Sequence, residues 1–172
     1  MRLEDEAIVL RLLEDDDAPS LAAAIGDDPD LDRWTRIPFP YTEDDAREFI
    51  ASTEESAFVI LDRSSGELLG GIGARTFDMA IVDIGYWVKA DARGRGVATR
   101  ALVLVARFAF DELGAGRVQL TTEVDNLASQ RVAEKAGFSR EGVLRSYLDF
   151  KGRRRDAVMF SLLAEDLAQD SS

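Results

Sequence analysis

Apolar residues recur along the chain with two different spacings, which predicts a protein built from both strands and helices. Residues 96–113 form the clearest helix, because Val97, Ala101, Leu104 and the apolar residues after them fall on one helical face. Three β-leaning runs between residues 57 and 89 are separated by short turns and predict an antiparallel meander. Strands are expected over residues 7–13, 57–62, 68–77, 82–89, 117–124, 139–150 and 156–163, and helices up to residue 25 and over residues 42–53, 96–113 and 126–136. The pattern favours a mixed α/β fold in which helices cover a largely antiparallel sheet.

The breaks between these elements are short, and they mark turns rather than a domain boundary. Residues 63–66 and the turn Asp78-Met79-Ala80 join strands, while residues 27–41 form a longer loop rich in Asp and Pro. Thr42 begins a capping-box pattern that closes with an aspartate at residue 45. The chain has 172 residues, 46% of them hydrophobic, and we expect residues 1–172 to form a single domain.

The composition excludes several classes of chemistry. The chain has no cysteine and no histidine, so thiolate nucleophiles, Ser/His/Asp triads and imidazole or thiolate metal sites are ruled out, and no metal site is expected. No apolar stretch approaches the roughly 20 residues of a membrane helix, and the first residues are acidic rather than basic. We therefore expect a cytoplasmic protein that does not bind membranes.

The net charge of −12 argues against binding nucleic acid or anionic membranes. The excess lies within the first 60 residues, which hold 17 acidic residues and 5 arginines, while the remainder is balanced. A solvated acidic surface is one interpretation. The other is an acidic lip, including Asp28, Asp30 and Asp32, that attracts cationic substrates.

An arginine- and glycine-rich loop precedes the long helix and is the most informative segment of the chain. It reads Arg93-Gly94-Arg95-Gly96 and follows the strand that carries Gly85-Tyr86-Trp87. A helix N-terminus offers unpaired backbone N–H groups to an anion, and glycine lets the ligand approach the backbone closely. The arginines add positive charge, so a pyrophosphate-bearing ligand fits. The P-loop and dinucleotide-binding motifs are not satisfied, because no Gly-Lys-Ser/Thr occurs and Thr99 stands where the last glycine would be.

Two motifs resemble those of Gcn5-related N-acetyltransferases, the GNAT superfamily. The loop and the residues after it, Arg93-Gly94-Arg95-Gly96-Val97-Ala98, match the [Gln/Arg]-x-x-Gly-x-[Gly/Ala] signature, and residues 126–138 match the later Asn-x-x-Ser block that ends in Gly-Phe. The sequences at residues 10–11, 38–41 and 152–156 are also similar to those of the RimJ/RimL-like branch of ribosomal-protein N-terminal acetyltransferases. The resemblance covers nearly the whole chain. It implies a central sheet of six to seven strands flanked by about four helices, with the fourth and fifth strands splayed apart.

The resemblance also implies a binding site for acetyl-coenzyme A (acetyl-CoA). The pantetheine arm would pair with the backbone of Trp87 and Val88 as an added strand. Asn126 would hold the pantetheine; it can also be a simple N-cap, a role that does not exclude contact with the ligand. Ser129, one turn later on the same helical face, would contact the sulfur. The pyrophosphate would be bound by the main-chain amides of Arg93, Gly94, Arg95, Gly96, Val97, Ala98 and Thr99.

Catalysis in this family is a direct attack of an amine on the thioester, in a ternary complex. With no histidine, a base would have to be a carboxylate acting through water, unless the amine loses its proton to solvent. Asp83 is the first candidate and Glu123 the second, and the simpler interpretation of each is an ordinary exposed strand residue. The N–H of Val88 would stabilise the oxyanion beside a bulge in its strand, and Ser129 would protonate or hydrogen-bond to the departing thiolate.

We therefore expect an N-acetyltransferase whose acceptor is a primary amine, either a protein N-terminus or a cationic small molecule, with a homodimer as one assembly the family adopts. The alternative is a non-catalytic module with the same fold that only binds a CoA thioester. A nucleic-acid-binding role for the Arg153-Arg154-Arg155 run is disfavoured by the overall charge.

Overall fold

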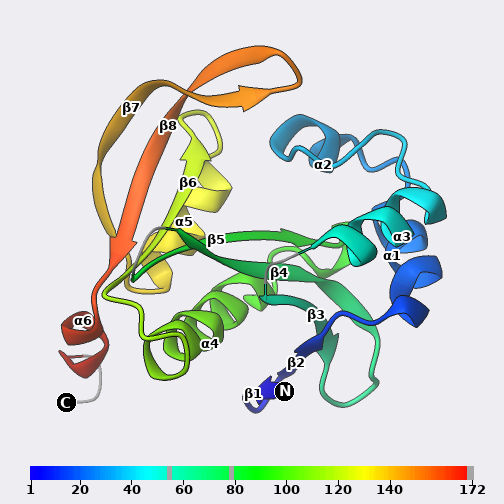
Figure 1. Ribbon diagram of the computed structural model, residues 1–172, viewed down its shortest axis with the longest axis horizontal. Helices are drawn as coiled ribbons and strands as arrows, with labels where there is room; N and C mark the ends of the chain where they lie inside the picture. The colour runs from blue at the N-terminus through cyan, green and yellow to red at the C-terminus, as the bar shows by residue number, and fades with distance from the viewer. Residues whose placement is uncertain (54–55, 78–79, 170–172) are drawn as a thin grey trace.

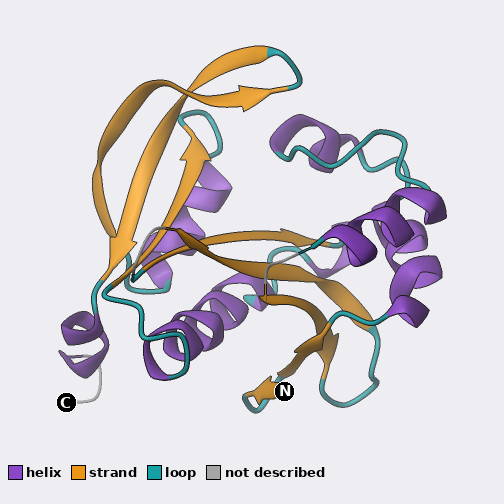
Figure 2. Ribbon diagram, viewed as in Figure 1, coloured by secondary structure: helices purple, strands orange, loops and turns teal. Residues whose placement is uncertain are grey.

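The computed structural model describes residues 1–53, 56–77 and 80–169. It contains one eight-stranded sheet in the order β1-β2-β3-β4-β5-β6-β8-β7, antiparallel except between β5 and β6 (Figures 1 and 2). The strands are β1 Arg2–Glu4, β2 Ile8–Leu12, β3 Ser56–Asp62, β4 Leu68–Phe77, β5 Ile81–Val88, β6 Arg117–Glu123, β7 Ser139–Phe150 and β8 Arg153–Leu162. The helices are α1 Ala18–Ile25, α2 Pro29–Trp34, α3 Glu43–Ser52, α4 Val97–Asp111, α5 Leu127–Lys135 and α6 Ala164–Gln169.

The mixed fold with a mostly antiparallel sheet is confirmed, and the structure adds three elements to it. Strand β1 pairs with β2, which lengthens the sheet by one strand beyond the expected number. Helix α2 lies in the segment expected to be a loop, and α6 follows the last strand. The predicted capping box is present at the start of α3, where Asp45 N–H donates to the Thr42 hydroxyl. The turn predicted at Asp78-Met79 lies outside the described residues.

Helices cover both faces of the sheet, and side-chain alternation along the strands supplies both cores. One cluster packs α4 and α5 against the sheet, with Phe58 and Phe108 in edge-to-face contact at 5.6 Å between ring centroids. The other packs α1, α2 and α3 against β3 on the opposite face. On β5, Tyr86 packs against the first cluster and Trp87 against the second, as successive residues of a strand must. No helix of the described residues is long and apolar enough to cross a membrane.

The sheet splits between β5 and β6, the fourth and fifth strands of the sequence prediction. Their parallel pairing covers only residues 81–83 and 117–119, and beyond these pairs the strands separate. Figure 2 shows β6, β7 and β8 bending away from β3, β4 and β5. The predicted splay is confirmed, but the expected bulge is absent from the β4–β5 ladder, which keeps one register from Gly70–Val88 to Phe77–Ile81. The opening therefore comes from lost pairing on the other edge of β5.

An ion pair with a hydroxyl contact fixes β7 across β8 to β6. The Glu141 carboxylate accepts from the Arg117 guanidinium at 2.7 and 2.9 Å and from the Ser161 hydroxyl at 2.6 Å. These donors, the guanidinium first, lower the pKa of Glu141 to about 2. The carboxylate is thus held ionised near the end of the sheet where β5 and β6 remain paired.

Candidate active site

The arginine- and glycine-rich loop forms an anion-binding cradle at the N-terminus of α4. Gly96 is the N-cap with φ of 78°, and Gly94 has φ of 72°, backbone conformations that side chains rarely adopt. A Cβ at either glycine would meet nothing within 4 Å, so both backbones border open space. The first main-chain bond of the helix runs from Arg100 N–H to Gly96 C=O. Among the described residues, the N–H groups of residues 94–99 have no acceptor, so they can bind phosphate oxygens.

The arginine side chains of this segment contribute less charge than the sequence indicates, because carboxylates pair with all of them. Arg93 pairs with Asp28 and Asp30, Arg95 with Asp62, and Arg100 with Asp5 and Glu6. The Arg93 Nε also donates to the Val88 carbonyl at 3.0 Å. The backbone amides, rather than free guanidinium groups, therefore provide the donors for an anion at this site.

The edge of β5 that faces the split presents the main chain of alternate residues. Lys89 N–H donates to Leu69 C=O at 2.9 Å, and the continuous register then pairs Trp87 with Gly71 on β4. The N–H of Val88 consequently points into the split, where an oxyanion donor is expected, and so does that of Tyr86. Trp87 differs from the expectation: its backbone faces β4 and its ring lies against Gly71. Tyr86 and Val88, rather than Trp87 and Val88, are the residues whose main-chain N–H groups face the split.

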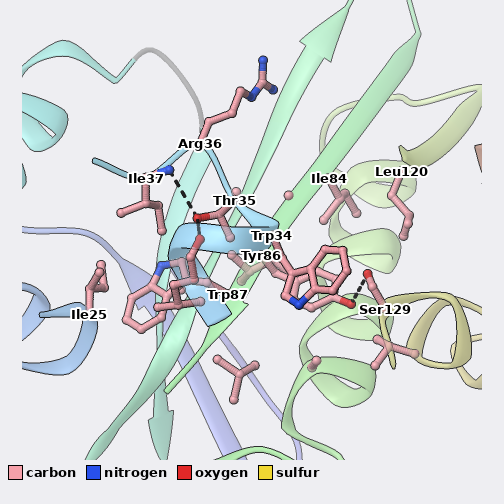
Figure 3. A pocket seen from close by; sticks show the side chains of 18 of the residues that line it. Ile25, Trp34, Thr35, Arg36, Ile37, Ile84, Tyr86, Trp87, Leu120 and Ser129 are labelled. Carbon is pink, nitrogen blue, oxygen red and sulfur yellow. Dashed lines mark hydrogen bonds between the residues drawn. The ribbon is translucent and has the colours of Figure 1, made fainter. Parts of the chain in front are cut away.

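Two hydroxyl groups meet across the split on the α4 side. Tyr86 Oη and Ser129 Oγ are hydrogen-bonded at 2.9 Å, joining β5 to α5 (Figure 3). Burial raises the pKa of the Tyr86 phenol, so this hydroxyl stays protonated at neutral pH and can donate to Ser129. Asn126 caps α5 by accepting from Ser129 N–H at 3.1 Å, which fixes the backbone that carries the serine. The link between Tyr86 and Ser129 was not predicted, because it joins residues 43 positions apart and has no local sequence signal.

The two candidate carboxylates lie at different depths in the split. Asp83 belongs to the last β5–β6 pair, at the closed end, and accepts from Gln119 Nε2 at 3.4 Å. Glu123 lies four residues beyond Gln119, level with Trp87 and roughly 13 Å from the Asp83 level along the strand. Its side chain is only 6% exposed, and Arg155 donates to Oε2 at 2.7 Å. Glu123 is thus a buried residue rather than an exposed strand position, and it is the carboxylate nearer the level of the Val88 amide.

A single large pocket of ≈ 1080 Å³ brings these groups together. Every predicted site residue lines it except Arg95, whose exposed side chain pairs with Asp62 outside the pocket. Figure 3 shows Trp34 of α2 in this pocket with Tyr86, Trp87 and Ser129. Trp34 was missed because it lies in the segment expected to be a loop. The Asp28-Pro29 pair was the available signal, since the Asp28 side chain caps α2 and Pro29 occupies its first turn.

Helix α2 is held over the pocket by ion pairs at two places. Asp28 and Asp30 bind Arg93 of the anion cradle, and Asp32 pairs with Lys151 in the turn between β7 and β8. Figure 1 shows α2 facing this turn. The three aspartates expected to form an acidic lip are therefore paired with cations of the chain itself, which reduces the charge they offer to a substrate.

A family model described as an acetyltransferase (GNAT) domain matches residues 7–139. The chain belongs to the GNAT acetyltransferase family. It is 32% identical to "Putative ribosomal N-acetyltransferase YdaF" of Bacillus subtilis (strain 168), with 94% of each chain covered. The acetyltransferase is also similar to the structure of Mycobacterium smegmatis RimJ in complex with CoA-disulfide, at a TM-score of 0.84 and 24% identity, covering 97% of this chain and 88% of the other.

A GCN5-related N-acetyltransferase from Brucella melitensis gives a TM-score of 0.84 at 25% identity, with 98% of this chain and 80% of the other covered. The chain is thus an acetyltransferase enzyme, and the RimJ/RimL-like resemblance noted in its sequence is confirmed.

Proposed function

We propose that this enzyme transfers the acetyl group of acetyl-CoA to a primary amine by direct attack in a ternary complex. The observation that supports this most is the position of the unpaired amides of residues 94–99 at the open end of a sheet that splits beside them. The amides can bind a diphosphate, and the free edge of β5 can pair with the amide groups of a pantetheine arm. This arrangement fits a CoA thioester better than a compact nucleotide.

The groups around the split correspond to the steps of the transfer. The amine nitrogen bonds to the thioester carbonyl carbon, and the N–H of Val88 stabilises the negative oxygen that forms. The C–S bond then breaks, and the nitrogen gives up a proton through water to a carboxylate, Asp83 or Glu123. The departing thiolate takes a proton from Ser129, and the carboxylate returns the amine proton to the Ser129 oxygen through water, so that no net charge is left on the enzyme. The Tyr86 and Ser129 hydroxyls are within hydrogen-bond distance of each other, and in this mechanism Tyr86 is the donor, which leaves the serine proton free to point toward the sulfur.

Ribosomal-protein acetyltransferases among the relatives favour an α-amine at a protein N-terminus as the acceptor. A small-molecule amine is the second possibility. Because Asp28, Asp30 and Asp32 are already paired, the acidic first third gives weaker support to a polycationic acceptor than the sequence suggested.

The test combines ligand binding with turnover. The melting temperature is measured with acetyl-CoA, free CoA, ATP and NAD, and only the first two are expected to stabilise the protein, by about 3 kcal/mol at a hundred times Kd. Free thiol release from acetyl-CoA is then measured with a panel of amines and N-terminal peptides. Stabilisation without thiol release for any acceptor favours the non-catalytic CoA-binding module, and stabilisation by ATP or NAD alone contradicts the proposal.

A further inference from the structure

Glu123 holds a buried carboxylate oxygen that no protein group satisfies. Its Oε2 accepts from Arg155, but its Oε1 is fully buried and has no hydrogen-bond partner among the described residues. It is the one buried side-chain polar atom of the described chain in this condition. A buried acceptor without a donor is costly, so a donor from outside the protein, such as a water or a substrate, is expected to satisfy it. Since Glu123 lines the pocket, the ligand that fills this position can be a substrate.

The register of the sheet places Glu123 on the face opposite the Tyr86–Ser129 pair. Val118 and Leu120 of β6 belong to the core under α4. Successive side chains of a strand point to opposite faces, so Glu123, an odd number of residues from both, points to the side of α1–α3. Its cross-strand partner is Ala157 on β8, and Arg155 lies two residues away on the same face. The carboxylate therefore approaches the level of the Val88 amide from one face, while the hydroxyl pair approaches it from the other.

Apolar side chains of β7 border the same carboxylate. Leu148 is the cross-strand partner of Arg155, and Phe150 lies two residues further on the same face. The Arg155 guanidinium stacks over the Phe150 ring, 5.8 Å from its centroid, while it holds Glu123 Oε2. Both apolar residues line the pocket, as does Trp34 of α2 on its other side. The wall that β7 contributes beside Glu123 is thus apolar, and the Arg155 guanidinium next to it is already engaged by Glu123.

We propose that Glu123 Oε1 binds the acceptor amine, that Arg155 positions the carboxylate by holding Oε2, and that Leu148, Phe150 and Trp34 receive an apolar group attached next to this amine. The inference rests on the proposed function and specifies its acceptor as a primary amine on an apolar or aromatic carbon skeleton. A compact diamine fits poorly at this wall, because its second charge would be desolvated against Leu148 and Phe150.

The first experiment measures the acceptor preference of the wild-type enzyme and needs no variant. Thiol release from acetyl-CoA is followed with 2-phenylethylamine and with 1,3-diaminopropane as acceptors. We expect kcat/KM to be at least about tenfold higher for 2-phenylethylamine, which corresponds to the affinity gained from one aromatic group. The inference would be overturned if kcat/KM for the diamine were equal or higher. It would also be overturned if 2-phenylethylamine were not acetylated while acetyl-CoA still raised the melting temperature. Neither outcome would contradict the cofactor assignment.

The second experiment replaces the carboxylate. Glu123→Gln keeps the shape of the side chain but removes its charge, and we expect the KM for 2-phenylethylamine to rise at least about tenfold with the KM for acetyl-CoA unchanged. Glu43→Gln is the matched control, because Glu43 also pairs with an arginine but lies on the exposed face of α3 outside the pocket. An unchanged acceptor KM in a folded Glu123→Gln variant contradicts the role of Glu123.

Arg155 is tested as a positioning residue by measuring the KM for the acceptor and the KM for acetyl-CoA separately. Arg155→Met should raise the acceptor KM, and Arg155→Lys should restore part of the loss, because lysine can still donate to Oε2. A purely structural role predicts instead that the KM values for both substrates change together with the melting temperature. If wild-type enzyme neither binds acetyl-CoA nor releases thiol, the proposed function itself fails, which is distinguishable from the outcomes above.

Discussion

Gly96→Ala tests the anion cradle, because this substitution separates backbone strain from ligand binding. Gly96 has φ of 78°, and a Cβ there meets no protein atom within 4 Å. The cost to the folded state is therefore limited to the left-handed backbone, about 1–2 kcal/mol, which lowers the melting temperature by roughly 2–8 °C. The added methyl group projects into the space beside the unpaired amides. Loss of one charge-assisted hydrogen bond to a phosphate costs about 1.5–3 kcal/mol, so acetyl-CoA should bind roughly 10- to 150-fold more weakly.

Gly66→Ala provides the matched control. Gly66 has φ of 74°, also has open space around its Cβ position, and lies in the turn between β3 and β4 away from the pocket. Both variants should lose similar stability without ligand, measured by thermal unfolding. Only Gly96→Ala should lose stabilisation by acetyl-CoA and show a raised KM in the thiol-release assay. Equal acetyl-CoA affinity in the two variants would refute the assignment of the cradle.

Further predictions concern the leaving group, helix α2 and the β6–β8 ion pair. Tyr86→Phe removes the proposed hydrogen-bond donor to Ser129. The loss of one hydrogen bond should lower kcat about three- to tenfold and leave the KM for acetyl-CoA unchanged. An unaltered kcat argues against this role of Tyr86. Asp28→Asn removes the buried partner of Arg93 and should raise the KM for acetyl-CoA severalfold in steady-state assays, and an unchanged value would show that Arg93 needs no such support. Glu141→Gln should lower the melting temperature at neutral pH. Because the folded-state pKa of about 2 is below the unfolded value, this deficit should shrink as the pH falls from about 5 toward 2; a constant difference contradicts the ion-pair explanation.

Local sequence patterns predicted most of the fold. The helix now seen at Val97–Asp111 and the strands Leu68–Phe77 and Ser139–Phe150 follow spacings that depend only on which side chains meet the core. The segment around α2 was assigned as a loop because the ion pairs that join it to the rest of the protein involve Arg93 and Lys151, which lie more than 60 and 110 residues away. No periodicity within six residues reports such contacts.

The residues of the candidate site were likewise predicted only where the signal is local in the sequence. Its glycine loop and Asn126 were found from contiguous motifs, and the structure brings them to one pocket. The ladder register, which decides that Val88 rather than Trp87 turns its N–H to the split, depends on pairing with β4 and could not be read from β5 alone. Similarly, the burial of Glu123 and its bond to Arg155 join residues 32 positions apart on strands that are neighbours only in the folded sheet.

The separation of β5 from β6 leaves this enzyme with a strand edge in the interior of its sheet. An edge at the periphery can be shielded by charge or by a covering loop, whereas this one must stay open for the reaction. In the complex proposed above, the pantetheine arm pairs with this edge, so the coenzyme completes the main-chain hydrogen bonding of the protein as well as delivering the acetyl group. The amide hydrogens of Tyr86 and Val88 should therefore exchange with solvent markedly more slowly once CoA is bound. In that state the coenzyme occupies the position of a ninth strand that leaves with the product.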